Sequence, residues 1–391
     1  MKLYAQVGFA LGDKVKAGIQ AKTINGAIFS PKDMALDSLR TKMEEVENAR
    51  GEVYFDPQYY VSLYASSPNA RLGKLTELPY FTPSRKSHLE IGKNIDEVLS
   101  NVLKIQVSLP VSAFIAPNIY ISKSFDSREA VIAKNFIRQA RARYNKLSCD
   151  KPLYVSLAIC REALMDQREF EEFINDITLL DEPPDGFYLM IGSRFPDIRE
   201  DIYNADVIAN WMFLNYSLDL NGYRLINGYS DILSPFLGAV GADAGATGWF
   251  FNLRTFSLDR FIPTNTGGRL PIIRYLSKLL LNRITCSEKE AFTAFIPGVL
   301  NELMFDDEYH PEPERAREVL QSWEAIQSLN TEMSGSNDIN ENLQRCDDAI
   351  ITAMNAYAAI SSRLSIERKS NDEHLESLQV GIRKFRELAE L

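Results

Sequence analysis

The chain has 391 residues, of which 45% are hydrophobic and 25% charged, a composition typical of a globular protein with a large core. Its formal net charge of −10 disfavours a wholly basic surface that binds nucleic acid indiscriminately, but it leaves room for a local basic groove. Four scattered cysteines and three isolated histidines lack the spacing of metal ligands, so we expect no metal and no other cofactor.

The N-terminal stretch "MKLYAQVGFALGDKVKAG" lacks the plan of a signal peptide. No apolar run along the chain reaches the length that spans a bilayer. The widely spaced cysteines also suit a reducing compartment. We therefore expect a cytoplasmic protein with no membrane partner.

From Gly26 onward, short apolar runs alternate with segments of helical periodicity. The apolar runs are nearly continuous, as expected for parallel strands buried on both faces. About eight such runs can be counted: GAIF (26–29), VYF (53–55), AFIAP (113–117), LYVSLAI (153–159), FYLMI (187–191), RLING (224–228), the region 245–251 and PIIRYLS (271–277).

This count predicts an α/β fold, a (β/α)₈ TIM-like barrel with a C-terminal α-helical extension. The barrel domain is expected over residues 1–285, with its first strand at Gly26 and a turn-rich insertion at about 59–93. A doubly wound open sheet is the main alternative. No Gly-x-Gly-x-x-Gly opens a helix after the first predicted strand, which weakens a dinucleotide-binding reading of that alternative.

Residues 286–391 read as helices, interrupted by the turn "SGSND" at 334–338. One segment carries an apolar stripe made of Ile350, Met354, Tyr357 and Ile360. Such a stripe indicates a core or a subunit interface, so a homo-oligomer through these helices is compatible with the sequence.

Polar residues follow most of the predicted strands. In a barrel, the carboxyl ends of the strands share one rim, where chemistry collects. Singly, each residue has a structural reading, such as a helix cap or a surface side chain. Together they predict a pocket for a polar, flat or anionic substrate, bound by Lys32, Asp33, Gln58, Tyr59, Asn118, Tyr120, Arg161, Ser193, Arg194, Tyr229, Asn252 and Arg254.

Asp56 ends the apolar run of "GEVYFDPQYY" abruptly. A carboxylate at a strand end, shielded by aromatic rings, can have a raised pKa and act as a general acid or base. It can also stabilise or attack an oxocarbenium-like sugar carbon. The alternative is an ordinary strand exit with no chemistry.

The helical segment "NFIRQARARYNK" carries a run of basic residues that includes Arg138 and Arg141. These two arginines are candidates for phosphate binding. A charge run of this kind is more commonly the solvated face of an outer helix.

The stretch "RLINGYSDILSPFLGAVGADAGATGWFFNLR" (224–254) resembles a segment of the tRNA-guanine transglycosylase family. The matching elements are Arg224, Gly228, the Gly241-Ala242-Asp243 triplet and Arg254. "VYFDPQYYVSL" and "GFYLMIGSRF" sit where that family has an Asp-led loop and a Gly-rich strand end. The resemblance implies a barrel that cleaves a base–sugar bond in nucleic acid, with catalytic roles for Asp56 and Asp243.

The chain departs from this family in three respects, the first being that "DPQYY" lacks the paired glycines of the family's loop. The family's second aspartate corresponds to Ala246, and its Cys/His zinc site is absent. The resemblance therefore implies a divergent glycosylase or transglycosylase-like enzyme acting on DNA rather than RNA, of the kind found in phage defence.

Two other classes of function stay open on the sequence. One is a barrel hydrolase on a small phosphorylated or glycosidic substrate, which would keep Asp56 without a duplex-sized surface. The other is a non-catalytic interaction subunit, in which the rim residues can be changed without consequence.

Overall fold

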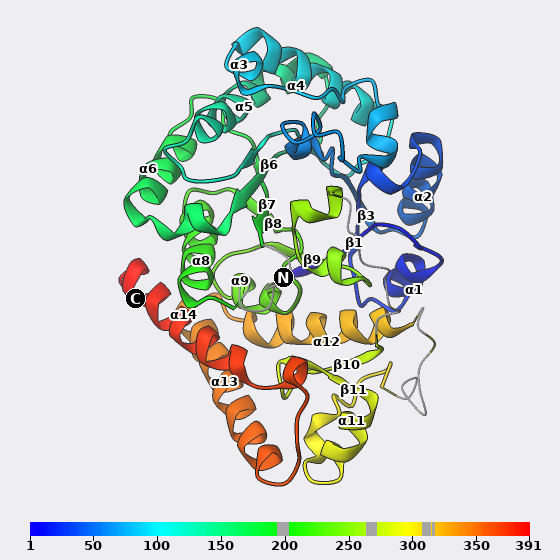
Figure 1. The fold of residues 1–391 in the computed structure, drawn as a ribbon, viewed down its shortest axis with the longest axis vertical. Coiled ribbons are helices and arrows are strands. Elements are labelled where there is room, and N and C mark those ends of the chain that lie inside the picture. Colours follow the sequence, from blue (N-terminus) through cyan, green and yellow to red (C-terminus); the bar gives the residue numbers. More distant parts are fainter. Residues whose placement is uncertain (194–202, 263–271, 307–313, 315–316) are drawn as a thin grey trace.

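The computed structural model describes residues 1–193, 203–262, 272–306, 314 and 317–391. Its central feature is a sheet of parallel strands wrapped into a barrel and surrounded by helices (Figure 1). The strands are β1 (Lys2–Gln6), β2 (Gly26–Phe29), β3 (Glu52–Phe55), β4 (Phe114–Ala116), β5 (Tyr120–Ile121), β6 (Leu153–Cys160), β7 (Gly186–Gly192), β8 (Arg224–Asn227) and β9 (Ala244–Thr247).

The strand order β3-β2-β1-β9-β8-β7-β6-β4 places neighbours in the chain side by side around the ring. Strands β4 and β5 both pair with β6, so they are two halves of one barrel position. At the remaining seam the Ser112 amide donates to the Val53 carbonyl at 2.7 Å, and the Ser112 hydroxyl accepts from the Val53 amide at 2.9 Å. The barrel is thus nearly closed, and the predicted (β/α)₈ fold is confirmed.

Helices cover the outside of the barrel between successive strands (Figure 1). Most of their apolar residues are buried, whereas their charged residues, apart from the buried Glu129 of α5, are exposed or partly exposed. These helices are α1 (Lys14–Gln20), α2 (Leu36–Asn48), α3 (Lys86–Leu89), α4 (Gly92–Val107), α5 (Arg128–Tyr144), α6 (Gln167–Thr178), α8 (Ala205–Leu220), α9 (Ser234–Gly238) and α10 (Phe251–Arg254).

Two of the predicted strand positions are wrong. The first barrel strand is β1 at Lys2–Gln6, not the strand at Gly26. The apolar run at 271–277 supplies β10 (Arg274–Ser277), which pairs antiparallel with β11 (Asn282–Thr285) as a hairpin outside the barrel. The division of the chain near residue 285 into barrel and helical region stays a prediction.

The helices after Cys286 are α11 (Cys286–Thr293), α12 (Glu318–Met333), α13 (Ile339–Ser361) and α14 (Glu373–Ala389). They do not form a separate layer, because α12 packs between α1 and α9 against β1. Its Trp323 is fully buried and donates from the indole to the Thr247 carbonyl at 3.2 Å. Helix α12 therefore occupies the wall position that a helix after the last barrel strand would take.

Helices α13 and α14 pack on each other, and α14 also packs on α8. The predicted apolar stripe lies on α13, with Ile350, Tyr357 and Ile360 fully buried and Met354 half-buried. A homo-oligomer through these helices stays a prediction. Among the described helices, none combines the length and apolarity needed to cross a membrane.

The interior of the barrel is unusually polar. The rings of Tyr4 and Tyr54 meet at 5.0 Å between centroids, and Tyr54 meets Tyr154 at 6.2 Å, although their strands are not neighbours. Two residues further along the same strands, and so on the same face, come Gln6 and Asp56. Barrel interiors are ordinarily filled by branched aliphatic side chains. These polar side chains make the barrel interior a candidate functional region.

Candidate active site at the carboxyl ends of the strands

Asp56 lies directly after β3 and is fully buried. Its two carboxylate oxygens accept one hydrogen bond each at 3.0 Å, from the Gln58 amide and from the Tyr60 hydroxyl. Burial raises the pKa of Asp56 to about 6, although these two hydrogen bonds and nearby Arg260 oppose the rise. The carboxyl group therefore changes its charge close to neutral pH.

The loop after β3 is shaped to hold Asp56. Gln58 has a left-handed backbone, with φ of 52°, which turns its amide back toward the aspartate. The Gln58 side-chain oxygen accepts from the Lys32 amide at 3.0 Å, so the loops after β2 and β3 are tied together. The predicted tyrosine, Tyr59, faces the other way. Its hydroxyl lies 2.9 Å from Ser84, and its ring packs on Phe136 of α5.

Arg260 faces the same interior from the turn Leu258–Phe261, which follows the last barrel strand. Only 4% of its side chain is exposed. It donates to the Tyr229 hydroxyl at 2.8 Å and lies 3.7 Å from the Asp33 carboxylate. Burial alone would lower the pKa of Arg260, but the facing hydroxyls and carboxylates raise it, so the guanidinium stays charged. The sequence analysis missed this residue.

Tyrosine hydroxyls complete the cluster around Asp56. Tyr188 donates to the Gln6 side-chain oxygen at 3.1 Å. Burial and the nearby Asp56 raise the pKa values of Tyr60, Tyr188 and Tyr229. The three hydroxyls therefore stay protonated, with those of Tyr60 and Tyr188 donating to Asp56 and Gln6.

Three buried donor atoms in this cluster have no hydrogen-bond partner among the described residues. They are the side-chain nitrogens Nε2 of Gln6 and Gln58 and the Nε of Arg260. Buried polar atoms are almost always paired, so such exceptions point to a bound molecule or water. All three are donors, which favours a ligand that offers oxygen acceptors.

The ring of Phe256 packs on the aromatic residues of this cluster. Its ring contacts Tyr60 at 5.1 Å, Tyr229 at 5.4 Å and Tyr120 at 6.1 Å between centroids. The segment is fixed to the end of β7, because the Phe256 carbonyl accepts from the Ser193 amide at 2.9 Å. Phe256 thus packs directly on Tyr60, the residue whose hydroxyl donates to Asp56.

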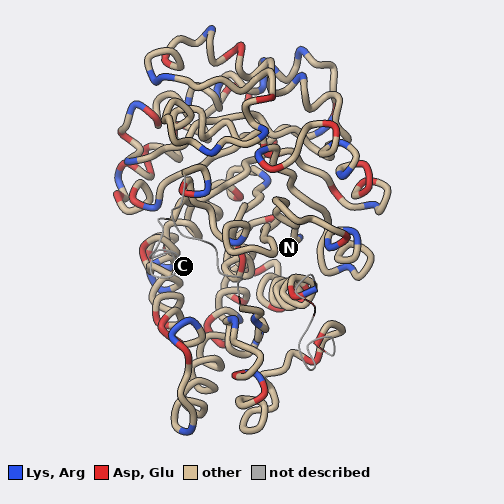
Figure 2. Tube along the Cα trace, turned by 45° about the vertical axis from the view of Figure 1, so that its right-hand side comes forward, with Lys and Arg blue, Asp and Glu red and all other residues tan. Residues whose placement is uncertain are grey.

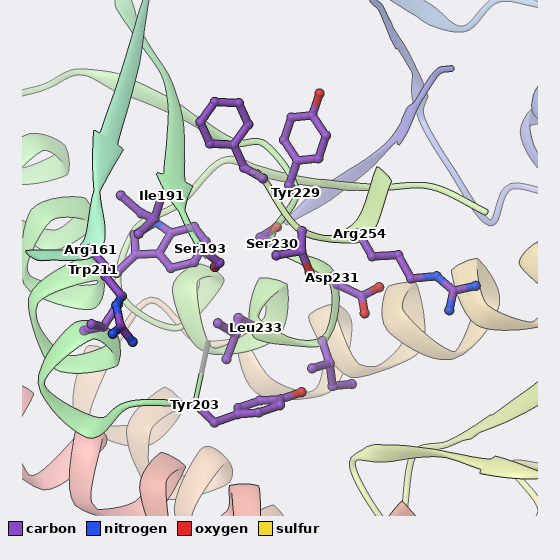
Figure 3. Close-up of a pocket in the computed structure, with 14 residues that line it drawn as sticks. Arg161, Ile191, Ser193, Tyr203, Trp211, Tyr229, Ser230, Asp231, Leu233 and Arg254 are labelled. Carbon is purple, nitrogen blue, oxygen red and sulfur yellow. The ribbon is translucent and has the colours of Figure 1, made fainter. Parts of the chain in front are cut away.

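Two cavities lie beside the segment that carries Phe256, and Ser193 lines both of them. The first, drawn in Figure 3, measures about 40 Å³, and Arg161 and Arg254 line it on opposite sides. It is large enough for a few waters or for one carboxylate or phosphate group. The second measures about 380 Å³, within the range of small-molecule pockets, and is lined mostly by apolar and aromatic residues such as Tyr64 and Phe261.

Asp231 is a second charged residue at the mouth that the sequence analysis did not select. It accepts from the Thr247 hydroxyl at 2.7 Å and from Arg283 of β11 at 2.9 Å. Burial opposes ionisation, but Arg283 holds the pKa of Asp231 below its usual value. Because Arg283 belongs to the hairpin after the barrel, the C-terminal region contributes directly to the mouth.

The predicted substrate-binding residues divide into three groups. Eight lie at the mouth: Lys32, Asp33, Gln58, Tyr120, Arg161, Ser193, Tyr229 and Arg254. Three do not contribute, because Tyr59 is turned outward, Asn118 donates to Ala133 of α5 at 3.3 Å, and Asn252 is exposed on α10. Arg194 lies outside the described residues.

Three further predicted residues lie away from the mouth. Asp243 precedes β9 at the amino end of the barrel, where it accepts from the Leu225 amide at 2.7 Å, so it cannot share a site with Asp56. Arg141 pairs with Asp185 at 2.8 Å near the same end. Arg138 lies exposed on α5, 4.0 Å from Asp176. Neither arginine can hold a phosphate at the mouth.

Comparison with known proteins assigns the chain to no family. No family model matches the chain, and no curated protein matches it. Among solved structures, the chain is similar to the HpcH/HpaI aldolase from Desulfitobacterium hafniense DCB-2. The identity is 10% and the TM-score 0.35, over 63% of this chain and 85% of the aldolase. The resemblance to the tRNA-guanine transglycosylase family stays a prediction.

The predicted glycosylase or transglycosylase activity on nucleic acid is corrected, together with DNA binding and phage defence. The geometry gives the physical reason: Asp243, Arg138 and Arg141 lie away from the mouth, and the mouth cavities have the size of small molecules. Figure 2 shows Lys and Arg interspersed with Asp and Glu over the described chain. Nucleic acid as a partner is a prediction without support.

Proposed function

We propose that the chain is a barrel enzyme that acts on a small phosphorylated or glycosidic substrate, with Asp56 as its general acid or base. The observation that carries the proposal is the fully buried Asp56, whose pKa of about 6 lies near the pH of most cellular chemistry. Hydrolysis of either kind of substrate needs a group that gives or takes a proton near neutrality.

The surrounding residues have separate tasks. Gln58 and Tyr60 fix the orientation of the carboxylate through their hydrogen bonds. Arg260 supplies a permanent positive charge that stabilises negative charge developing on the substrate. The unpartnered donors on Gln6, Gln58 and Arg260 would bind the oxygens of the substrate.

The two cavities support a substrate with two unlike parts. A hydroxyl-rich group suits the small cavity, whose lining includes Ser193, Ser230 and Asp231 (Figure 3). A larger, flatter part suits the apolar cavity beside Tyr64 and Phe261. Phe256 lines the small cavity and packs on Tyr60, the hydrogen-bond donor to Asp56, so its displacement by the substrate would open a path to the carboxylate.

The test is the hydrolysis of p-nitrophenyl phosphate and of a panel of p-nitrophenyl glycosides. We expect turnover of one of these classes by the wild type, with a pH profile of kcat/KM that changes slope near pH 6. Asp56→Asn should lower turnover by about 10²-fold or more.

The matched control is Asp37→Asn on the exposed face of α2, which should leave turnover unchanged. A folded wild type that hydrolyses neither class would exclude the proposed activity. Full turnover by Asp56→Asn would exclude the assigned role and would favour a mouth that serves binding alone.

A further inference from the structure

A separate cavity of about 460 Å³ opens at the amino end of the barrel, opposite the Asp56 site. Its walls come from the beginnings of β1, β3, β6, β8 and β9. The amino end of a barrel ordinarily serves stability and is closed by packed side chains. A cavity of small-molecule size at this end has no part in the function proposed above.

Tyrosine rings form much of this cavity's wall. Tyr4, Tyr54 and Tyr154 all line it, and each is at least 95% buried. The hydroxyls of Tyr4 and Tyr54 donate to the same oxygen of Glu52, at 2.6 and 2.8 Å. Both hydroxyl hydrogens are thereby committed, so these hydroxyls can offer a ligand only their oxygens, as acceptors.

Charges of both signs stand around these rings. Lys2 pairs with Glu52 at one side of the cavity, and Arg224 and Asp243 line it as well. Burial and the nearby Asp243 raise the pKa of Tyr154 to about 12, whereas Arg224 opposes the rise. Arg224 and Asp243 thus both lie close to the Tyr154 hydroxyl. The lining carries two positive and two negative side chains.

We propose that this cavity binds a small zwitterion of the amino-acid type, with one carboxylate and one ammonium group. The Arg224 guanidinium has the planar fork that suits a carboxylate, and it lies at the exposed start of β8. An ammonium group is attracted by tyrosine faces and by the second oxygen of Asp243. Lys2 and Glu52 neutralise each other, so Arg224 and Asp243 are the lining charges that a ligand would meet. A ligand with a single charge would compensate only one of these two residues.

The test is saturation-transfer-difference NMR on the full chain with a mixture of the standard amino acids. We expect transfer to at least one of them, and loss of that signal for its N-acetyl derivative and for its carboxamide. Arg224→Gln and Asp243→Asn should each weaken binding of that amino acid by about tenfold or more. Thermal melting checks that both variants fold.

Two control variants check that binding depends on this cavity. Arg138→Gln removes an exposed arginine from the outer face of α5 and should bind as the wild type does. Asp56→Asn should also bind normally, so the two sites can fail independently. The proposal is overturned if no amino acid receives saturation, or if Arg224→Gln binds as tightly as the wild type.

Discussion

Asp56 and Tyr60 form the most constrained contact at the mouth, a 3.0 Å hydrogen bond between two fully buried side chains. The neighbouring Tyr59 has the same chemistry but donates or accepts at Ser84, away from the mouth. The two tyrosines thus form a natural pair of test and control positions within one short turn.

We predict that Tyr60→Phe raises the pKa of Asp56 further, by about one unit, because the lost hydrogen bond favours the charged carboxylate. Tyr59→Phe should leave that pKa unchanged. The measurement is a pH titration of the Asp56 carboxyl carbon by NMR in ¹³C-labelled protein. An equal shift in both variants would mean that the bond to Tyr60 does not control the carboxylate.

The same carboxylate makes the stability of the protein depend on pH. Its folded pKa of about 6 exceeds the ordinary value of 3.8, so the folded state holds this proton more tightly than the unfolded state does. The contribution of Asp56 to folding is therefore complete below about pH 4 and is lost as the pH rises through 6.

Asp56→Asn removes this dependence. We expect the unfolding free energy of Asp56→Asn, relative to wild type, to increase by up to about 3 kcal/mol between pH 4 and pH 7. Urea unfolding at several pH values measures this difference. A difference that stays constant with pH would show that Asp56 is not titrating in the folded state.

At the scale of elements, the barrel could be predicted because most of its strands are apolar on both faces. The run at 153–159 is buried throughout as β6, and the polar strand exits mark the rim. Strand β1 escaped prediction because Tyr4 and Gln6 point into a polar interior, which removes the apolar signature. The run at 271–277 was wrongly predicted to be a barrel strand. It forms part of a hairpin whose strands are as apolar as those of the barrel.

The candidate site was predictable only in part. Asp56 stands out because a carboxylate ends a buried strand, and that placement is visible in the sequence. Arg260 could not be found, because a turn after the last strand carries it back across the mouth to Tyr229. The choice between Tyr59 and Tyr60 depended on the left-handed turn at Gln58, which a single sequence does not reveal.

For the molecule as a whole, α12 joins the C-terminal region to the barrel. Trp323 contacts the end of β9, and the Gln327 side chain donates to the Met1 carbonyl at 3.2 Å. Arg283 adds a second anchor at Asp231. Through these two contacts, the C-terminal region stabilises barrel elements that lie much earlier in the sequence.

We predict that Trp323→Ala lowers the unfolding free energy by about 3–5 kcal/mol, because it empties a fully buried position between α12 and the barrel. Phe251→Ala, which removes a half-exposed ring from α10, should cost less than about 1 kcal/mol. Thermal and urea unfolding of both variants measure the difference. Similar losses for the two variants would mean that α12 is only loosely attached.

The position of α12 has a consequence for synthesis on the ribosome. Strand β1 leaves the exit tunnel long before α12, the helix that covers it, has been translated. Until then, the apolar surface that Trp323 will cover on the nascent barrel is open to water and to other nascent chains. Chaperones that shield such surfaces should therefore be needed for most of the time that this chain takes to be made.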